Sequence, residues 1–319
     1  MQKTNARRLF PALAACLLLC AAPKETGAQK KAGGSNPVVS SAGSTKPCAS
    51  APQAPAGPSS SVQPAPAGWE IGHLFGDASG CAVLYAPASG QYSLYQPQMC
   101  ETRFSPYSTF KIISACMGLH NGVLESEDSR MHYSGAQYPV PAWNADLSLK
   151  EAFQSSCVWY FRQVIDALGE ERVAQELKAL SYGNCDISQW EGSGINPLPD
   201  MNGFWLGASL KVSPIEQVQA LAQIFSGAGI YTAQETAVVK DMMLAGEAES
   251  WRLYGKTGTG PAGEAWFTGF VQNGSQSLYF AFFLNGSASG QVPSGDMAKE
   301  IAFRALSDAA GVQFQPCEA

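Results

Sequence analysis

The sequence predicts an α/β chain of the α+β type: a mainly antiparallel sheet built from both chain ends and flanked by helices, with an inserted helical subdomain. Strand-like segments occur at 81–95 and again at 251–284, and helical patterns occupy the stretch between them. Because strands and helices do not alternate, a doubly wound parallel sheet is disfavoured. Apolar residues make up 45% of the 319 residues, which is enough for a sizeable core.

The folded region opens with a hairpin pattern and continues into a helix. Residues 81–86 are strand-like, a Pro-Ala-Ser-Gly turn follows, and a second strand is expected at 92–95. Residues 108–120 then carry apolar side chains on a helical period, which stops at Gly122.

Start signals or helical patterns mark four further helical segments in the middle of the chain. Ser148 and Glu151 have the spacing of a capping box. Helical patterns cover 156–168 and 170–180, and residues 213–216 combine an N-cap serine, a proline and an acid at the third helical position.

A long loop lies between the helical patterns at 170–180 and 213–216, and strands follow in the last third. Residues 183–203 are rich in Gly, Pro and Asn, and a loop of that length in a compact domain is usually functional. Strands are expected at 251–257, 265–272 and 277–284, followed by a final helix at 297–309.

Charge and composition exclude several classes of function. The net charge of −6 argues against a nucleic-acid binder held by phosphate contacts. Residues 69–319 carry 13 of the basic and 25 of the acidic residues, so they should be soluble and should not bind anionic membranes. His73, His120 and His132 show no metal-ligand spacing and Cys-x-x-Cys is absent, so no metal site is predicted.

The first 28 residues have the pattern of an export signal. Three basic residues precede the apolar run 10–22, which is too short for a comfortable membrane span. Two ways of processing this signal stay open: lipidation at Cys16 or Cys20, and simple cleavage near Ala28. We therefore expect an exported protein, periplasmic or extracellular, with a lipid anchor as one of two alternatives.

Residues 29–68 are predicted to be a disordered tether before a catalytic domain at 69–319. This segment holds 28 Pro, Ala, Ser or Gly among 40 residues and no aromatic residue. It therefore cannot bury enough apolar surface to offset the entropy of ordering. The segment either holds the domain near a membrane or wall, or is a spacer with no role.

The cysteines of the folded region divide into two kinds. Cys81 and Cys100 flank the predicted hairpin and are candidates for a disulfide, because export permits oxidation. The distance that the bond needs stays open at this stage. Cys116 and Cys157 fall on predicted helix faces and are expected to be buried thiols.

The chemistry-bearing pair is Ser108 and Lys111, which lie three residues apart and share a helix face. Ser108 falls in the first turn, where free N–H groups and the helix dipole favour developing negative charge. A lysine accepts a proton only when neutral, and burial lowers its pKa in that direction. Taken alone, Ser-x-x-Lys is a weak signal.

Three further motifs strengthen that signal. Ser156-Cys157-Val158, Tyr182-Gly183-Asn184 and Lys256-Thr257-Gly258 follow in the order typical of penicillin-recognising serine enzymes. Over residues 69–310 the chain resembles the class D, oxacillinase-type β-lactamases. The segments that carry the resemblance are GCAVLY, SPYSTFKI, SCVWYF, YGN, FWLGASLKVSP, YGKTGTG and AWFTGF.

The resemblance implies a fold of the β-lactamase/transpeptidase type and roles for the catalytic residues. Ser108 would attack the β-lactam carbonyl, and Lys111, N-carboxylated by carbon dioxide, would be the general base for acylation and deacylation. Ser156 would relay a proton to the ring nitrogen, and Lys256 would assist it and raise the positive potential. The N–H groups of Ser108 and Thr259 would form the oxyanion hole.

The resemblance also implies the surroundings of these groups. Trp205, rather than the nearby Trp190, would donate its indole N–H to the carboxylated lysine, and Phe110 with two other apolar residues would keep the pocket dry. Apart from carbon dioxide or bicarbonate, no cofactor is implied. The residues expected to line the substrate site are Val158, Tyr182, Asn184, Trp205, Leu206, Thr257, Gly258 and Thr259.

One departure from the family pattern concerns the substrate carboxylate. Many class D enzymes have an arginine after the last strands that binds this group. Residues 285–296 hold neither arginine nor lysine, so the carboxylate is expected to rest on Thr257, Thr259 and Lys256, or on a group from elsewhere.

Three functions compete. The leading hypothesis is a serine β-lactam hydrolase that confers resistance. A D-Ala-D-Ala peptidase or transpeptidase should show Ser-x-Asn, and Val158 counts against it. A β-lactam sensor would become acylated and stay so; it needs membrane helices, and the apolar run of 13 residues at 10–22 disfavours a full receptor. The oligomeric state is left open.

Overall fold

The computed structural model describes residues 67–317. The predicted export signal, with Cys16 and Cys20, and the tether up to residue 66 lie outside the described residues. Ala67 and Gly68, which the sequence assigned to the end of the tether, form a short strand. Among residues 67–317 every helix is too short or too polar to cross a membrane.

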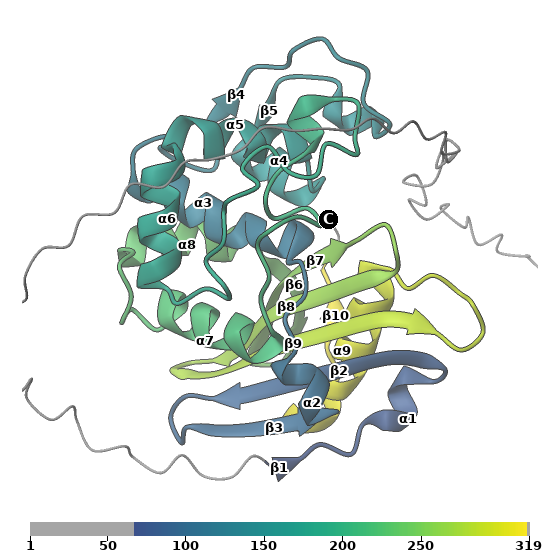
Figure 1. Cartoon of the computed structure of the whole chain (residues 1–319). Helices are drawn as coiled ribbons and strands as arrows, with labels where there is room; N and C mark the ends of the chain where they lie inside the picture. Colours follow the sequence, from purple (N-terminus) through teal and green to yellow (C-terminus); the bar gives the residue numbers. More distant parts are fainter. Residues whose placement is uncertain (1–66, 318–319) are drawn as a thin grey trace, which may run out of the picture. The chain divides into compact units, whose positions relative to one another are not determined.

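One eight-stranded sheet joins the two ends of the described chain (Figure 1). Every neighbouring pair is antiparallel except β1 with β3, which confirms the predicted mainly antiparallel sheet. The strands follow one another across the sheet in the order β1 (Ala67–Gly68), β3 (Gln91–Tyr95), β2 (Ala78–Ala86), β9 (Gln276–Ser287), β8 (Glu264–Asn273), β7 (Trp251–Thr259), β6 (Leu244–Ala248) and β10 (Gln315–Pro316).

Helices cover both faces of this sheet, and Figure 1 shows α9 on the face opposite the other large helices. A separate two-stranded ribbon, β4 (Arg130–Met131) with β5 (Leu147–Ser148), lies in the helical insertion. The helices are α1 (Gly72–Phe75), α2 (Pro97–Glu101), α3 (Phe110–His120), α4 (Leu149–Gln154), α5 (Val158–Leu168), α6 (Glu170–Ala179), α7 (Pro214–Phe225), α8 (Ala233–Met242) and α9 (Gly295–Ala310), with 3-10 turns η1 (Tyr107–Thr109), η2 (Pro141–Trp143) and η3 (Pro199–Met201).

The position of strand β9 between two hydrophobic cores explains why its sequence is a continuous apolar run. Successive side chains of a strand point to opposite faces. Phe280 and Phe282 pack in the core under α9, whereas Ala281 and Phe283 pack in the larger core that the helical subdomain shares. Because both faces are covered, alternation with polar residues is lost.

Capping boxes define three helix starts. Those at Ser148 and Ser213, predicted from the sequence, are both formed, with the serine side chain accepting from the third helical N–H. A third box at Thr232 and Glu235 opens α8, a helix that the sequence analysis missed although the same spacing was there to find. Strand β6, also missed, follows that helix.

The two serine motifs differ locally from their predicted helical form. Ser108 belongs to the 3-10 turn η1, and the α-helix begins only at Phe110. Ser156 lies before α5 with φ of 57°, in the left-handed region. The expectation that it starts the helix is wrong, because the chain must turn there before the helix begins at Val158.

The disulfide candidate is also corrected, because Cys81 and Cys100 are free thiols. Both are fully buried, and Cys100 Sγ lies 3.2 Å from the carbonyl oxygen of Tyr95 and 3.4 Å from that of Ala82. Burial raises the pKa of Cys81 well above its ordinary value. Cys116 and Cys157 are buried thiols as predicted.

We expect Ser213→Ala to lower the free energy of unfolding by about 1 kcal/mol, because the N–H of Glu216 loses its acceptor. Urea unfolding followed by circular dichroism measures the change. Ser226→Ala, at the other end of α7, is the matched control and should change stability by less than about 0.5 kcal/mol. Equal effects of the two substitutions would contradict the cap.

Candidate active site

The site lies where η1 meets strand β7. Gly258 makes this approach possible, because a Cβ there would lie 3.1 Å from Pro106 O and 3.4 Å from Ser108 N. Any side chain at this position would push the strand away from the serine. The segment around Ser108 and the Lys256-Thr257-Gly258 motif, about 150 residues apart in the sequence, are therefore in direct contact.

Ser108 and Lys111 form the centre of the site. Lys111 Nζ lies 2.7 Å from Ser108 Oγ, and the lysine side chain is 0% exposed. The Phe161 ring from α5 stands 5.7 Å from the same nitrogen. Desolvation, and next the positive charge of Lys256, hold the pKa of Lys111 well below its ordinary value. A neutral amine can accept the serine proton.

Lys256 and Ser156 form a second pair beside the first. Lys256 Nζ donates to Ser156 Oγ at 3.1 Å and to the carbonyl of Thr257 at 3.2 Å. Burial lowers the pKa of Lys256 to about 8, while the charge of Asp296 opposes that shift. The left-handed turn at Ser156 places its hydroxyl within reach of this ammonium.

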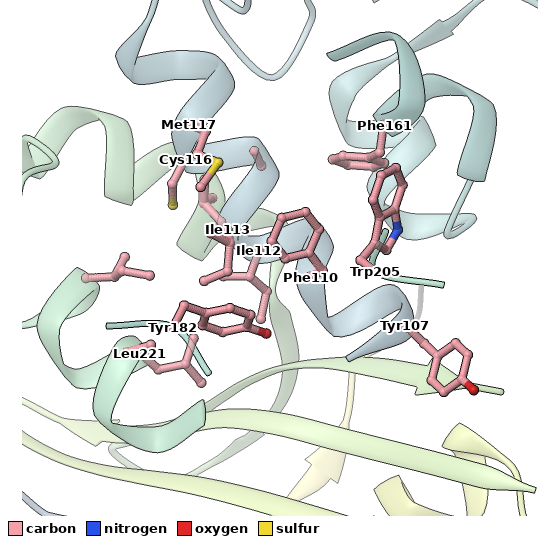
Figure 2. Packing of buried hydrophobic residues seen from close by; sticks show 14 of the residues in the cluster. Tyr107, Phe110, Ile112, Ile113, Cys116, Met117, Phe161, Tyr182, Trp205 and Leu221 are labelled. Carbon is pink, nitrogen blue, oxygen red and sulfur yellow. The ribbon is translucent and has the colours of Figure 1, made fainter. Parts of the chain in front are cut away.

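Trp205 presents an unused hydrogen-bond donor. Its ring is fully buried and packs 5.6 Å from Phe110, the residue before Lys111 (Figure 2). Among the described residues its Nε1 is buried without a hydrogen-bond partner. Leaving such a group unpaired costs about 1–3 kcal/mol, so this N–H is available to an acceptor. Trp190 instead stacks on Phe204 at 5.3 Å and faces the Arg162 guanidinium.

Comparison with known proteins identifies the family. The profile of the penicillin binding protein transpeptidase domain matches residues 80–306. The chain belongs to this family. Within it, the regulatory protein BlaR1 of Bacillus licheniformis is 34% identical over 72% of this chain and 36% of its own length. The probable β-lactamase YbxI of Bacillus subtilis is 33% identical over 65% of this chain and 74% of its own length.

Solved structures agree with that assignment. The class D β-lactamase from Bacillus subtilis has a TM-score of 0.67 at 31% identity, covering 76% of this chain and 96% of its own. The C-terminal domain of the Bacillus licheniformis BlaR penicillin-receptor has a TM-score of 0.68 at 31% identity, covering 77% and 96%. The resemblance to class D β-lactamases is thereby confirmed, and the chain spans little more than a third of the BlaR1 relatives it matches.

Two residues expected to bind substrate have polar groups that already hold protein partners. Tyr182 is fully buried near α3 (Figure 2), and its hydroxyl donates to Gln217 of α7 at 3.2 Å. Asn184 donates to the carbonyl of Ser209 and accepts from the N–H of Lys211, both at 2.9 Å. Asn184 therefore fixes the start of the long loop, and substrate binding by both residues stays a prediction.

The other residues predicted to bind substrate differ in exposure. Val158 is nearly buried, Leu206 and Thr257 are half-buried, and Thr259 is exposed. Trp205, which the sequence analysis included among the substrate contacts, is too deeply buried to touch a molecule in the cleft.

Phe161, in the SCVWYF segment, is an aromatic wall residue, and its ring faces the Lys111 amine. Lys299 of α9 was missed by the sequence analysis. It lines a pocket together with Lys256 and Thr257, and its charge lowers the pKa of Lys256. Lys299 is a cation three residues beyond 285–296, the stretch without arginine or lysine. Within residues 67–317 no group of three His, Cys, Asp or Glu side chains could hold a metal ion.

Burial of Lys256 should make the stability of this domain depend on pH. The folded-state pKa of about 8 lies below the ordinary 10.5, so between these values the unfolded chain binds more protons. The free energy of unfolding therefore rises with pH across this window, on the order of 3 kcal/mol, relative to Lys256→Met. Urea unfolding of both proteins between pH 7 and pH 11 measures it, and parallel curves would contradict the buried amine.

Proposed function

We propose that this chain hydrolyses the β-lactam amide of penicillin-type antibiotics through an acyl-enzyme on Ser108, with N-carboxylated Lys111 as general base. Its action would confer β-lactam resistance. The observation that carries the proposal is the dry pocket in which Lys111 lies 2.7 Å from Ser108, with the unpaired N–H of Trp205 nearby.

Carboxylation follows from the pKa of Lys111. Only a neutral amine attacks carbon dioxide; the nitrogen forms a bond to the carbon and releases a proton. Burial lowers the pKa of Lys111 in the direction that keeps the amine neutral. The indole N–H of Trp205 would donate to the anion so formed, which accounts for its lack of a partner among residues 67–317.

Acylation is then an ordinary acyl transfer. Carboxylated Lys111 removes the proton of Ser108, whose Oγ attacks the β-lactam carbonyl while the N–H groups of Ser108 and Thr259 stabilise the oxyanion. As the carbon–nitrogen bond breaks, Ser156 passes a proton to the ring nitrogen. The neighbouring Lys256 supports that transfer through its 3.1 Å hydrogen bond. The proton held by the base then returns to Ser156 by way of Lys256, so the base is free again. In deacylation it takes a proton from a water whose oxygen attacks the acyl carbon, and that proton passes to the Ser108 oxygen as the acid leaves.

The substrate carboxylate would rest on groups that face this cleft. Thr257 and Thr259 supply hydroxyls, and Lys256 supplies positive charge. Lys299, three residues beyond the stretch that lacks arginine, adds a second cation beside Lys256 and Thr257. This arrangement would replace the arginine of other class D enzymes.

A β-lactam sensor is the second candidate, because two proteins named as regulatory protein BlaR1 match this chain at 34% and 31% identity. A sensor would use the same Ser108 acylation and differ only in failing to deacylate. The peptidase reading is weaker, because Val158 stands where such enzymes carry asparagine.

Turnover of a chromogenic cephalosporin by the purified full chain separates these functions. We expect many turnovers per molecule, with a rate that rises when bicarbonate is added. A single burst equal to the enzyme concentration, with no further hydrolysis, would exclude the hydrolase and support the sensor. Lack of any acylation by a fluorescent penicillin would exclude both.

Lys111→Ala should abolish turnover, since the base is lost while the fold has no need of a buried amine. The far-ultraviolet circular dichroism spectrum and the melting temperature should show that the variant is folded. Lys150→Ala, which removes an exposed lysine paired with Glu127, is the control and should keep the parental rate. A near-parental rate in Lys111→Ala would show that the assigned base is wrong.

Trp205→Phe should slow deacylation and make activity more dependent on bicarbonate, because the ring is kept while the indole donor is lost. The concentration of bicarbonate that gives half-maximal activity is the readout. Trp190→Phe is the matched control, since Trp190 faces Arg162 and not the pocket. An unchanged bicarbonate response in Trp205→Phe would undo the assignment.

We propose in addition that the chain is exported. The support is the basic segment and short apolar run at 10–22, and lipidation at Cys16 or Cys20 remains one of two alternatives. Mass spectrometry of the mature N-terminus from producing cells would distinguish a diacylated cysteine from cleavage near Ala28, and an unprocessed Met1 would contradict export.

A further inference from the structure

Tyr107, the residue directly before the nucleophile, has an unusual backbone conformation. Its φ is 48°, in the left-handed region that costs a bulky side chain of order 1 kcal/mol or more. Its side chain is only 5% exposed, and Figure 2 shows the ring directed away from Phe110 and Trp205. Something in the surroundings must therefore hold Tyr107 in place.

The ring of Tyr107 is wedged between two glycines. A Cβ added at Gly260 would lie 2.4 Å from Cζ of this ring, and one added at Gly207 would lie 3.5 Å from its hydroxyl oxygen. Gly207 follows Trp205 and Leu206 in the long loop, whereas Gly260 directly follows Thr259 on β7. The backbone N–H of Tyr107 also donates to Trp205 O at 3.0 Å. The tyrosine thus links the two walls of the cleft.

Glu264 completes this arrangement. Its Oε2 would lie 2.5 Å from the same Cβ at Gly260, so the carboxylate and the tyrosine ring converge on one backbone position. The Tyr107 ring and this carboxylate therefore lie side by side; burial, and next the negative charge of Glu264, raise the pKa of Tyr107, so the hydroxyl stays protonated. Glu264 also receives the N–H of Ala262 at 3.2 Å, and its carbonyl receives that of Gly260 at 2.7 Å.

We propose that Tyr107, through its contact with Gly260 and Glu264, is a positioning residue that sets the spacing of the two oxyanion donors. Tyr107 directly precedes the Ser108 N–H, and Gly260 directly follows Thr259, which carries the other donor. Fixing Tyr107 against Gly260 therefore fixes one donor relative to the other. The inference rests on the proposed acyl transfer at Ser108.

The charge of Glu264 gives the hydroxyl a second effect. A carboxylate at the end of β7 disfavours negative charge developing on the substrate carbonyl. The Tyr107 hydroxyl, together with the N–H of Ala262, engages that carboxylate and holds it at Gly260. Removing the hydroxyl both loosens the wedge and frees the carboxylate.

Tyr107→Phe is the direct test, because it keeps the ring and removes the hydroxyl. We expect single-turnover acylation by a fluorescent penicillin to slow about tenfold, since small misplacements of reacting groups are costly. Affinity for a phenylboronic acid, whose serine adduct fills the oxyanion hole, should fall by a similar factor. Tyr231→Phe is the matched control, because that buried hydroxyl donates to Glu176 at 2.8 Å, far from the cleft in sequence and structure. It should lower the melting temperature and leave both readouts unchanged.

Substitutions at Glu264, the residue that faces Tyr107, provide a second test of the same contact. Glu264→Leu should slow acylation by less than Tyr107→Phe does, because it loses the contact but also removes the carboxylate charge that opposes the oxyanion. The double variant should be no slower than Tyr107→Phe, because both substitutions act through one contact. Glu264→Gln, which keeps an acceptor, should recover most of the rate. Acylation of Tyr107→Phe within twofold of the parent, or fully additive losses, would overturn the inference. A parent protein that is not acylated at all would overturn the proposed function and this inference with it.

Discussion

The burial of one amine beside one hydroxyl is the constraint on which the rest of the structure depends. Lys111 lies one helical turn after Ser108, inside a pocket closed by Phe110, Phe161 and Trp205. In water this amine would be charged and could neither accept a proton nor react with carbon dioxide. The helical subdomain therefore contributes to chemistry chiefly by excluding water, and a buried lysine is a cost that the surrounding core must offset.

The sheet supplies the other half of the site. Its order places β2 from the N-terminal side next to β9 from the C-terminal side, so the helical insertion is held at both of its ends. Strand β7 then runs past η1, and the absence of a side chain at Gly258 lets the two backbones meet. Lys256 lies on that strand and donates a hydrogen bond to Ser156, which belongs to the helical insertion.

The relatives of this domain include hydrolases and a regulatory receptor on one fold. A shared fold is compatible with both functions, because function depends on the site and not on the fold. The proposed hydrolase differs from the proposed sensor only in whether a base and a water act a second time at Ser108. The measurement of turnover against a single burst addresses that difference.

The sequence by itself determined the antiparallel sheet, the capping boxes at Ser148 and Ser213, and the Ser108–Lys111 pair. Each of these depends on residues close together in the chain, through periodicity, helix caps and spacing. Only the tertiary structure decided burial: Tyr182 belongs to the core, Asn184 holds a loop, and the thiol of Cys81 is free. It also decided that, within residues 67–317, the Trp205 indole nitrogen is buried without a hydrogen-bond partner. These properties depend on neighbours distant in the chain, which no local pattern records.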